Sequence, residues 1–329
     1  MEPEIIQTGV PTDPQWDSAW AQSDNATFHH SREWHQIWQT YTQGSIAPCP
    51  ISIEFSDGKK AVIPLSVHAV LKGTVKRYLS SPATSYGGWF STEQLTGQHH
   101  ELILNHLSQA FPALILRFNP LINYKPGGFA QYIKEDTTQM ITFDGDFTSQ
   151  FKTWTKGHKA AITQARKAGV TTRLAAADAD WDQFYQMYLD SFQRWGDKAT
   201  SKYKPDFFQA FRDLNSRFVN LWLADYQGQT VAGSLIFYSK RHVMYGYSAA
   251  LGKFFNLRAM NVLLHDVIKD ACEKKYAYFD LSPSGGHSGV ASFKKSFGAH
   301  EVSANILERQ PGWLKTMEKI YKAWLIRVT

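Results

Sequence analysis

Residues 243–299 constrain the fold of this chain more than any other stretch, because three regular elements follow one another there. Residues 243–249 alternate apolar with small or polar side chains, as a strand does. Residues 261–274 repeat apolar side chains at helical spacing, and residues 276–281 form an aromatic-rich segment typical of a short strand. A loop with three glycines and a second helical segment come next. Because a strand–helix–strand unit ending in a glycine-rich loop commonly builds a pocket at the end of a sheet, the pattern predicts a ligand-binding unit.

The end of this stretch carries a more specific signature. Residues 279–299 read FDLSPSGGHSGVASFKKSFGA and resemble the C-terminal signature of the FemAB-like, or BioF2-like, branch of the GNAT acyltransferase superfamily. That branch includes peptidoglycan-bridge aminoacyltransferases and relatives in polysaccharide systems. Besides the glycine-bearing loop, the matching positions are Phe279, Asp280, Gly289, Val290, Phe293, Lys294, Phe297, Gly298 and Ala299.

The resemblance extends over most of the chain and implies a mixed α+β fold. It implies two tandem GNAT-like domains, each with a mostly antiparallel central sheet flanked by helices. A length of 329 residues accommodates two ordinary domains. The polar, turn-prone stretch 144–150 indicates their junction. We therefore expect an N-terminal GNAT-like domain over residues 1–147 and a catalytic GNAT-like domain over residues 148–329.

Composition and charge narrow the class of protein. A hydrophobic content of 43% and an aromatic content of 14% exclude a largely disordered chain. No apolar run approaches the roughly 18–20 residues that span a bilayer. The first residues carry acids and prolines instead of a basic, apolar leader, so we expect a cytoplasmic location. The net charge of +6 suits a phosphate- or carboxylate-rich partner such as tRNA, a nucleotide-sugar, a lipid pyrophosphate or coenzyme A, but many bacterial proteins are equally basic.

Cysteine and histidine residues indicate neither a disulfide framework nor a metal centre. Cys49 and Cys272 lie in different expected elements and are read as free thiols. His29, His30 and His35 lie close together in sequence, but no cysteine or carboxylate accompanies them at a metal-ligand spacing. We expect no bound metal.

The N-terminal half shows alternating helix and strand patterns. Residues 31–41 place aromatic and aliphatic side chains on one helical face, and 51–70 read as a hairpin around an Asp-Gly turn. A helix over 93–112 and strands over 113–118 and 138–143 follow.

A Tyr-Gly-Gly sequence, Tyr86, Gly87 and Gly88, follows a strand-like segment in this half. It has two interpretations. Glycine can serve a simple turn, because it reaches backbone angles that other residues avoid. In the family that the chain resembles, the equivalent loop lines a substrate cleft, which makes these three residues candidates for substrate binding.

Residues 151–175 resemble the family's basic helix and the strand that follows it, with Lys156, Lys159, Arg166 and Lys167 among the cations of the helix. Such a helix is either a solvated face or a site that neutralises phosphates, so Lys159 and Arg166 are candidate substrate-binding residues.

The remaining elements expected in the C-terminal half surround the signature. A helix over 180–195 carries an aromatic stripe that we assign to the core, and Arg194 and Trp195 at its end resemble the place where relatives shape their acceptor site. A helix over 205–214 and several strands within 219–250 come next.

Acyl transfer to an amine requires positive charge where the carbonyl oxygen becomes negative. The resemblance gives this role to Lys294, with Phe293 packing beside it; the alternative is an ordinary surface lysine. Asp280 would orient the substrate amine or act as a base, or else stabilise the loop, and Tyr247 and Ser282 would line the pocket. No nucleophile elbow, Walker loop, HExxH motif or Cys-His pairing is present, which favours direct attack by the amine in a ternary complex.

One segment departs from acetyl-CoA-dependent GNAT enzymes, which carry a glycine-rich pyrophosphate loop ahead of the long helix. Here the segment reads AALGKFFNLRAMN, with Gly252 as its single glycine and with bulky Phe254 and Phe255. Few bare amides would be free to hold a pyrophosphate, which favours an aminoacyl-tRNA or another acyl carrier over acetyl-CoA. Lys253 and Arg258 could still bind a phosphate.

The sequence therefore predicts an acyltransferase without a permanently bound cofactor. It would move an acyl or aminoacyl group from aminoacyl-tRNA or acyl-CoA to an amine of a cell-wall or surface-polysaccharide precursor. Contact with a membrane would be peripheral, through a lipid-linked acceptor. Two alternatives remain open: an acetyl-CoA-dependent N-acetyltransferase, and a degenerate GNAT pair that binds tRNA or a nucleotide-sugar without catalysis.

Overall fold

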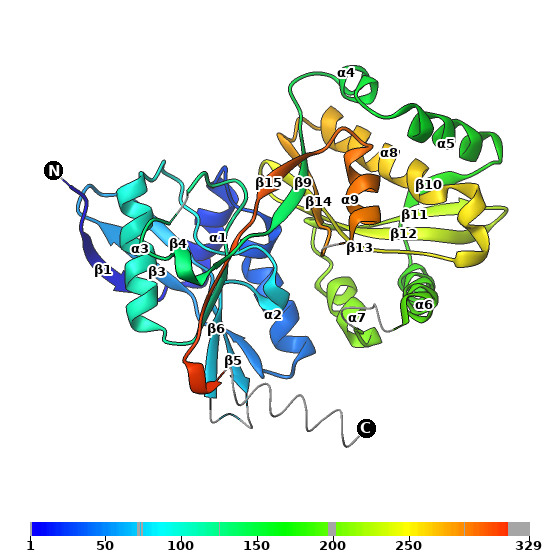
Figure 1. Ribbon diagram of the computed structural model, residues 1–329. Coiled ribbons are helices and arrows are strands. Elements are labelled where there is room, and N and C mark those ends of the chain that lie inside the picture. Colours follow the sequence, from blue (N-terminus) through cyan, green and yellow to red (C-terminus); the bar gives the residue numbers. More distant parts are fainter. Residues whose placement is uncertain are drawn as a thin grey trace. The chain divides into compact units, whose positions relative to one another are not determined.

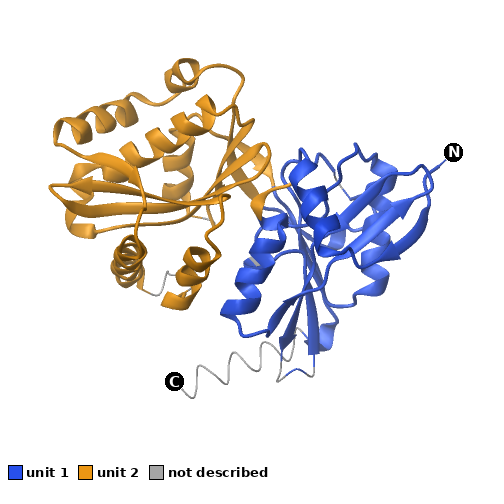
Figure 2. Ribbon diagram, turned by 180° about the vertical axis from the view of Figure 1, so that it is seen from behind, with its two compact units in different colours: residues 1–25, 29–136, 304–329 blue, residues 26–28, 137–303 orange. Residues whose placement is uncertain are grey.

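The chain folds into two compact units in the computed structural model, which describes residues 2–70, 73, 75–124, 126–196, 202–285 and 287–314 (Figure 1). Unit 1 comprises residues 1–25, 29–136 and 304–329, and unit 2 comprises residues 26–28 and 137–303 (Figure 2). In the described part of the chain, no helix has the length and apolar character needed to cross a membrane.

Unit 1 contains two sheets. The smaller sheet has the strand order β1-β3-β4 and the larger has β2-β5-β6-β7-β16-β8. The strands of the smaller sheet are β1 Ile5–Gly9, β3 Ile51–Phe55 and β4 Lys60–Ile63. The strands of the larger sheet are β2 Ile46–Pro48, β5 Ser66–Val70, β6 Val75–Leu79, β7 Leu114–Arg117, β8 Ile133–Lys134 and β16 Ile306–Arg309. The α-helices are α1 Asp13–Gln22, α2 Arg32–Tyr41 and α3 Gly97–Ala110, and short 3-10 turns cover Pro82–Thr84 and Ala130–Tyr132.

Local sequence explains where the first elements of unit 1 begin. Thr12 and Gln15 form a reciprocal capping box at the start of α1. The hydroxyl of Ser31 accepts a hydrogen bond from the Trp34 amide at the start of α2, as the expected helix requires. The expected hairpin forms between β3 and β4, but it ends at Pro64, which has no N–H for a ladder bond. The chain therefore resumes as β5 in the other sheet.

Unit 2 has one seven-stranded sheet with the order β10-β11-β12-β13-β14-β9-β15. All of its neighbouring pairs are antiparallel except β13 and β14, which are parallel. Its strands are β9 Thr137–Thr142, β10 Thr171–Leu174, β11 Val219–Tyr226, β12 Gln229–Tyr238, β13 His242–Ala250, β14 Tyr278–Pro283 and β15 His300–Ser303.

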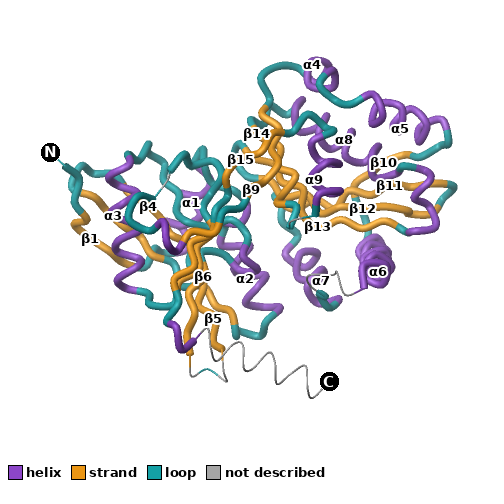
Figure 3. Tube along the Cα trace, in the orientation of Figure 1, coloured by secondary structure: helices purple, strands orange, loops and turns teal. Residues whose placement is uncertain are grey.

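Helices cover both faces of this sheet (Figure 3). Helices α5 and α8 lie on one face, and α6 and α7 lie on the other. A continuous apolar core fills the space between α8 and the strands and includes Val262, Val267, Val243 and Phe279. The helical segments are α4 Phe147–Lys152, α5 Lys156–Lys167, α6 Asp178–Trp195, α7 Pro205–Leu214, η5 Gly252–Leu257, α8 Ala259–Glu273 and α9 Ser288–Lys295.

The two units divide the chain differently from the expected boundary between residues 147 and 148. Strand β9 belongs to unit 2, because it pairs with both β14 and β15. The chain then returns to unit 1 at Ala304, and β16 inserts between β7 and β8. These pairings join short strands that are far apart in sequence, and the local sequence near residue 304 does not predict them.

Candidate active site

A pocket of about 660 Å³ opens in unit 2 where the two parallel strands separate. Strands β13 and β14 pair only from His242 opposite Tyr278 to Met244 opposite Asp280. Beyond these pairs both strands continue, and the residues that follow line the pocket: 245–250 from β13 and 281–283 from β14. The end of α6, the segment η5 and helix α9 complete the wall. Ligands of α/β folds commonly bind at the carboxyl ends of parallel strands, and this pocket has that location.

A β-bulge shapes the wall that β13 contributes. Ser234 pairs with Ser248 and Ile236 with Tyr245, so two residues of β13 lie opposite one residue of β12. One of the two is Gly246, where a Cβ atom would lie 2.5 Å from the Phe237 ring. Only glycine fits this close approach. The other bulge residue, Tyr247, lines the pocket as expected.

The floor of the pocket is held by an unusual backbone conformation at Ser282. Its φ of 66° lies in the left-handed region, which non-glycine residues seldom adopt. Two hydrogen bonds fix it: the Ser282 amide donates to Asp280 Oδ1 at 2.7 Å, and its hydroxyl donates to the Tyr245 carbonyl oxygen at 2.5 Å. The second bond bridges β13 and β14 at the point where their pairing has ended.

Lys294 lies in the wall of this pocket and is not a surface lysine. Its side chain is 4% exposed, and its ammonium donates to the carbonyl oxygens of Ser282 at 2.6 Å and Pro283 at 3.0 Å. Burial lowers the pKa of Lys294 to about 8, and the nearby Asp280 carboxylate opposes this shift. An ammonium has three N–H donors, and no acceptor for the third is recorded among the described residues.

Asp280 lies beneath the pocket and does not line it. It is fully buried, and Thr138 Oγ1 donates to its Oδ1 at 2.6 Å. His242 Nε2 lies 3.3 Å from Oδ2. Together with the Ser282 amide, these contacts occupy both carboxylate oxygens. The geometry therefore favours the loop-stabilising interpretation of Asp280 over contact with a substrate amine.

Phe293 orients α9. Its ring lies 5.2 Å from that of His158 on α5 and 5.1 Å from that of Phe297, both nearly edge-on. Phe293 also lines the pocket, next to Lys294. The Phe-Lys pair thus combines a packing residue with a buried cation.

Arg194 and Trp195 both line the pocket, at the end of α6. Arg194 is already engaged: its guanidinium donates to the Asp190 carboxylate at 2.9 Å and to the Ala250 carbonyl oxygen at 2.6 Å. Trp195 is 45% exposed and meets the His287 ring edge-on at 5.8 Å. Of the two, Trp195 offers the freer surface to a substrate.

The segment after β13, where acetyl-CoA-dependent relatives hold a pyrophosphate, is occupied by a carboxylate. The Gly252 amide donates to Asp190 Oδ2 at 3.0 Å. A Cβ at Gly252 would lie 2.8 Å from Arg194, so this glycine serves close packing. Arg258 is exposed, has a left-handed φ of 56° between η5 and α8, and does not line the pocket.

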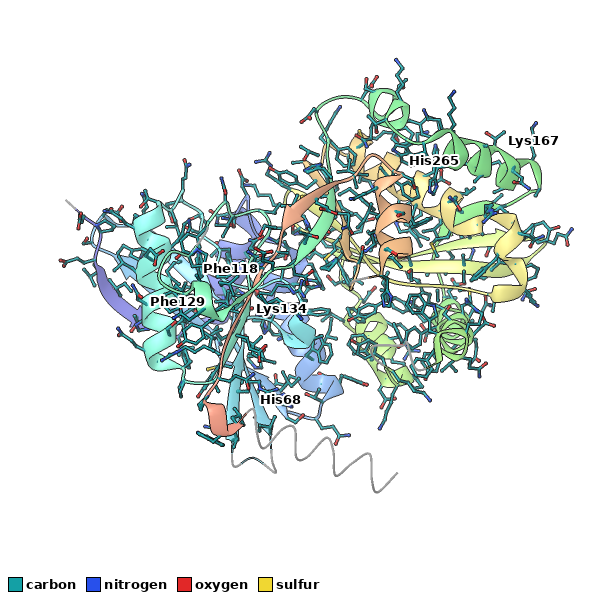
Figure 4. All side chains as sticks on the ribbon, viewed as in Figure 1. His68, Phe118, Phe129, Lys134, Lys167 and His265 are labelled. Carbon is teal, nitrogen blue, oxygen red and sulfur yellow. The ribbon has the colours of Figure 1, made fainter. Side chains whose placement is uncertain are left out.

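The two candidate residues on α5 contact protein groups. Arg166 forms an ion pair with Asp266 on α8 at 2.5 Å, and Lys159 donates to the Lys152 carbonyl oxygen at 3.0 Å. Neither lines the pocket at the parted strands. Lys167, by contrast, lies at the far end of α5 and extends outward (Figure 4).

Tyr86, Gly87 and Gly88 lie in unit 1 and are buried. A Cβ at Gly87 would lie 2.3 Å from the Ser80 carbonyl oxygen, so glycine is required by packing. Gly88 has a φ of 87°, which favours glycine for its conformation. These contacts support the turn interpretation of this sequence.

Several lining residues were not among the candidates from sequence, and Tyr245, Phe255 and His287 are among them. Phe255 is 51% exposed, and burial raises the pKa of Tyr245 to about 12, which keeps its hydroxyl protonated at neutral pH. Within the described part of the chain, no Asp or Glu side chain lines the pocket, whereas Lys294 and Arg194 do. The charged side chains on the described wall are therefore both cationic.

Comparison with known proteins identifies the class. A family model described as an acetyltransferase (GNAT) domain matches residues 155–295. The structure is similar to that of FemX, with a TM-score of 0.72 and 12% identity over 92% of this chain and 96% of that chain. L-PGS from Bacillus licheniformis matches with a TM-score of 0.53 and 13% identity over 89% of this chain and 92% of that one. A tandem GNAT protein from the clavulanic acid biosynthesis pathway matches with a TM-score of 0.50 and 9% identity over 94% and 100%, respectively.

No curated protein matches the chain by sequence. The fold is that of the FemAB-like branch of the GNAT superfamily, as the signature at 279–299 predicted. The mixed α+β architecture with tandem GNAT-like units is confirmed. Its GNAT domain makes the chain an acyltransferase.

Proposed function

We propose that this acyltransferase moves an aminoacyl group to an amine of a cell-wall or surface-polysaccharide precursor in the cytoplasm. The observation that carries the proposal is the buried ammonium of Lys294 beside the parted strands β13 and β14. Two backbone carbonyl oxygens hold that ammonium in place, and its third N–H remains to meet a substrate oxygen. A protein that only binds its ligand has no need for such a cation.

The reaction would proceed by direct attack. The amine nitrogen attacks the carbonyl carbon of the donor ester, and a C–N bond forms while the carbonyl oxygen becomes an anion. Lys294 would donate its third N–H to that anion. As the tetrahedral intermediate collapses, the C–O bond to the donor breaks, the leaving ribose oxygen takes up a proton and becomes a hydroxyl, and the amine nitrogen loses a proton. The imidazole of His287, which lines the pocket, is the candidate acceptor of that proton.

The contacts of the Gly252 amide support a donor other than acetyl-CoA. Backbone amides of a glycine-rich loop normally bind pyrophosphate, because they present N–H donors to its oxygens. Here that amide donates to the Asp190 carboxylate, whose negative charge would repel a pyrophosphate at the same position. An aminoacyl-tRNA avoids this conflict, because it carries its acyl group on a ribose and has no pyrophosphate.

The test uses purified protein, two donors and a panel of amines. Alanyl-tRNA and acetyl-CoA are each incubated with muropeptide precursors that carry a free amine, and the amide product is measured by mass spectrometry. We expect a product from alanyl-tRNA and a loss of about 10²-fold or more in rate for Lys294→Met, as for removal of an oxyanion donor. Transfer only from acetyl-CoA would replace the proposal by the acetyltransferase alternative. Binding without transfer from either donor would favour the binding-module alternative.

A further inference from the structure

We propose that Phe255 and Trp195 form a stacking platform for the adenine of the donor's terminal adenosine, at the mouth of the pocket that contains Lys294. The inference rests on the proposed function and adds where the non-reacting end of the donor binds. Both rings line the pocket, and both are about half exposed, at 51% and 45%. Aromatic side chains that combine pocket contact with this much exposure have ring surface available for a ligand.

Phe255 is held in a fixed orientation. The Arg194 guanidinium lies 4.4 Å from the centroid of its ring, in a cation–π contact. Arg194 itself is anchored by hydrogen bonds to Asp190 and to the Ala250 carbonyl oxygen. One part of the Phe255 ring is therefore supported by an anchored cation while the rest remains exposed, which is the arrangement of a preorganised stacking surface.

Trp195 lines the same pocket from the end of α6. It is the last residue of α6, directly after Arg194, and its ring meets His287 edge-on at 5.8 Å. His287 precedes α9, the helix that carries Lys294. Phe255 thus belongs to the segment after β13 and Trp195 contacts the loop before α9, and both of these segments line the pocket that contains Lys294.

The charges beside the platform suit a nucleotide. Lys253 and Arg258 are exposed on the same short segment as Phe255. Arg258 has no side-chain partner recorded within the described part of the chain, and the Lys253 ammonium lies over the neighbouring Phe254 ring at 4.7 Å. An aromatic surface flanked by cations binds single-stranded nucleic acid, because bases stack on the rings and phosphates pair with the cations.

A membrane is the less favoured occupant of this surface. Among the described residues of unit 2, only Leu174, Trp195 and Phe255 are large hydrophobic side chains with substantial exposure. Two rings at a pocket mouth provide little apolar area for insertion into a bilayer, whereas they match the size of one base. Anionic lipid is accordingly an alternative outcome of the test.

The adenine could come from two sources, the 3′-terminal adenosine of a tRNA or the adenosine of coenzyme A, and two probes distinguish them. The first is a short RNA hairpin ending in single-stranded CCA, with 2-aminopurine replacing the terminal adenine so that stacking quenches its fluorescence. The second is coenzyme A, titrated by calorimetry. The variants are Phe255→Ala, Phe255→Tyr, Trp195→Ala and the double substitution Lys253→Gln with Arg258→Gln. Trp313→Ala, at an exposed tryptophan of unit 1, is the matched control.

We expect Phe255→Ala and Trp195→Ala each to weaken binding of the RNA about 5- to 150-fold and to reduce the quenching, because base–aromatic stacking has that magnitude. Phe255→Tyr and Trp313→Ala should bind like the original protein. The double substitution should weaken RNA binding. It should also reduce the slope of log K against log salt concentration by the amount that corresponds to about two phosphate contacts. If the ring substitutions weaken binding of coenzyme A but not of the RNA, the two rings do bind adenine, and that adenine belongs to coenzyme A.

Unchanged RNA and coenzyme A binding in both ring variants would overturn the platform, as would a failure of both probes to bind the original protein. If Phe255→Ala and Trp195→Ala lose cosedimentation with phosphatidylglycerol vesicles but keep RNA binding, the two rings form a membrane-facing surface instead. Failure of the platform is distinguishable from failure of the proposed function. Transfer from alanyl-tRNA that depends on Lys294 and persists in Phe255→Ala with unchanged KM would preserve the function and remove the platform.

Discussion

Replacing Lys294 by Met separates the chemistry of the buried ammonium from its effect on stability. One pKa unit corresponds to about 1.4 kcal/mol. A fall in the pKa of Lys294 from 10.5 in the unfolded chain to about 8 in the folded protein therefore lowers the free energy of unfolding by about 3 kcal/mol near neutral pH, where the side chain is charged. Met has a similar length and no charge, so Lys294→Met removes this term. It also leaves the Ser282 and Pro283 carbonyl oxygens without their donor, at a cost of about 1–3 kcal/mol each.

These opposing terms give a specific pH dependence. Between pH 8 and 10.5 the unfolded chain binds the Lys294 proton more strongly than the folded protein, so the free energy of unfolding rises with pH in this window. From pH 7.5 to 9.5 the original protein should gain about 2 kcal/mol relative to Lys294→Met. Near pH 7.5 the two proteins should differ by no more than about 3 kcal/mol, because the terms largely offset each other.

The assay is urea unfolding of both proteins at the two pH values, followed by tryptophan fluorescence, alongside the rate of aminoacyl transfer. If the ammonium stabilises the oxyanion, transfer by the original protein should decline as pH rises through about 8, where Lys294 loses its proton. Parallel stability profiles for the two proteins would refute the burial argument. A rate that rises through pH 8 would instead indicate that neutral Lys294 acts as a base.

Two further substitutions test the structural roles of single residues. Gly87→Ala should destabilise the protein by about 1–3 kcal/mol, because its Cβ would lie 2.3 Å from the Ser80 carbonyl oxygen. Gly97→Ala should be neutral or stabilising, because no atom lies within 4 Å of the added Cβ. Equal unfolding midpoints for the two variants would contradict the packing argument. At the strained Ser282, glycine should be more stable than alanine by about 1 kcal/mol, because both variants lose the hydrogen bond to Tyr245 and only glycine relieves the left-handed φ. Thermal unfolding of this pair measures the difference, and a more stable alanine variant would exclude backbone strain.

Much of the secondary structure could be predicted from periodicity, because helices and strands repeat their apolar residues locally. Helix α2, the β3–β4 hairpin and helix α8 form close to the ranges that their patterns indicate. The break between β4 and β5 follows from Pro64 and was visible in the sequence, although the hairpin was expected to continue through it. Strands β15 and β16 have four residues each, too few for a periodic signal.

The site was partly predictable. A signature that places Phe293 and Lys294 after a glycine-bearing loop identified the residue that lies in the pocket wall. Burial of that residue could not be predicted, since it depends on Ser282 adopting a left-handed conformation and on the carbonyl oxygens that this turn presents. Composition describes Arg194 as an available cation, yet it pairs with Asp190 one turn earlier in α6 and with the Ala250 carbonyl oxygen on β13, and only the first of these partners is local in sequence.

The contacts of Asp190 link the two questions that the sequence left open, the identity of the donor and the purpose of the altered loop. Its carboxylate accepts from the Gly252 amide and from Arg194, and Arg194 in turn lies against the Phe255 ring. The same ion pair that occupies a glycine amide therefore also fixes an exposed aromatic ring at the pocket mouth. A loop altered only by loss of pyrophosphate binding would have no reason to retain an anchored aromatic ring beside two exposed cations. The combination is more consistent with a loop adapted to a different phosphate-bearing donor than with a loop that has lost its ligand.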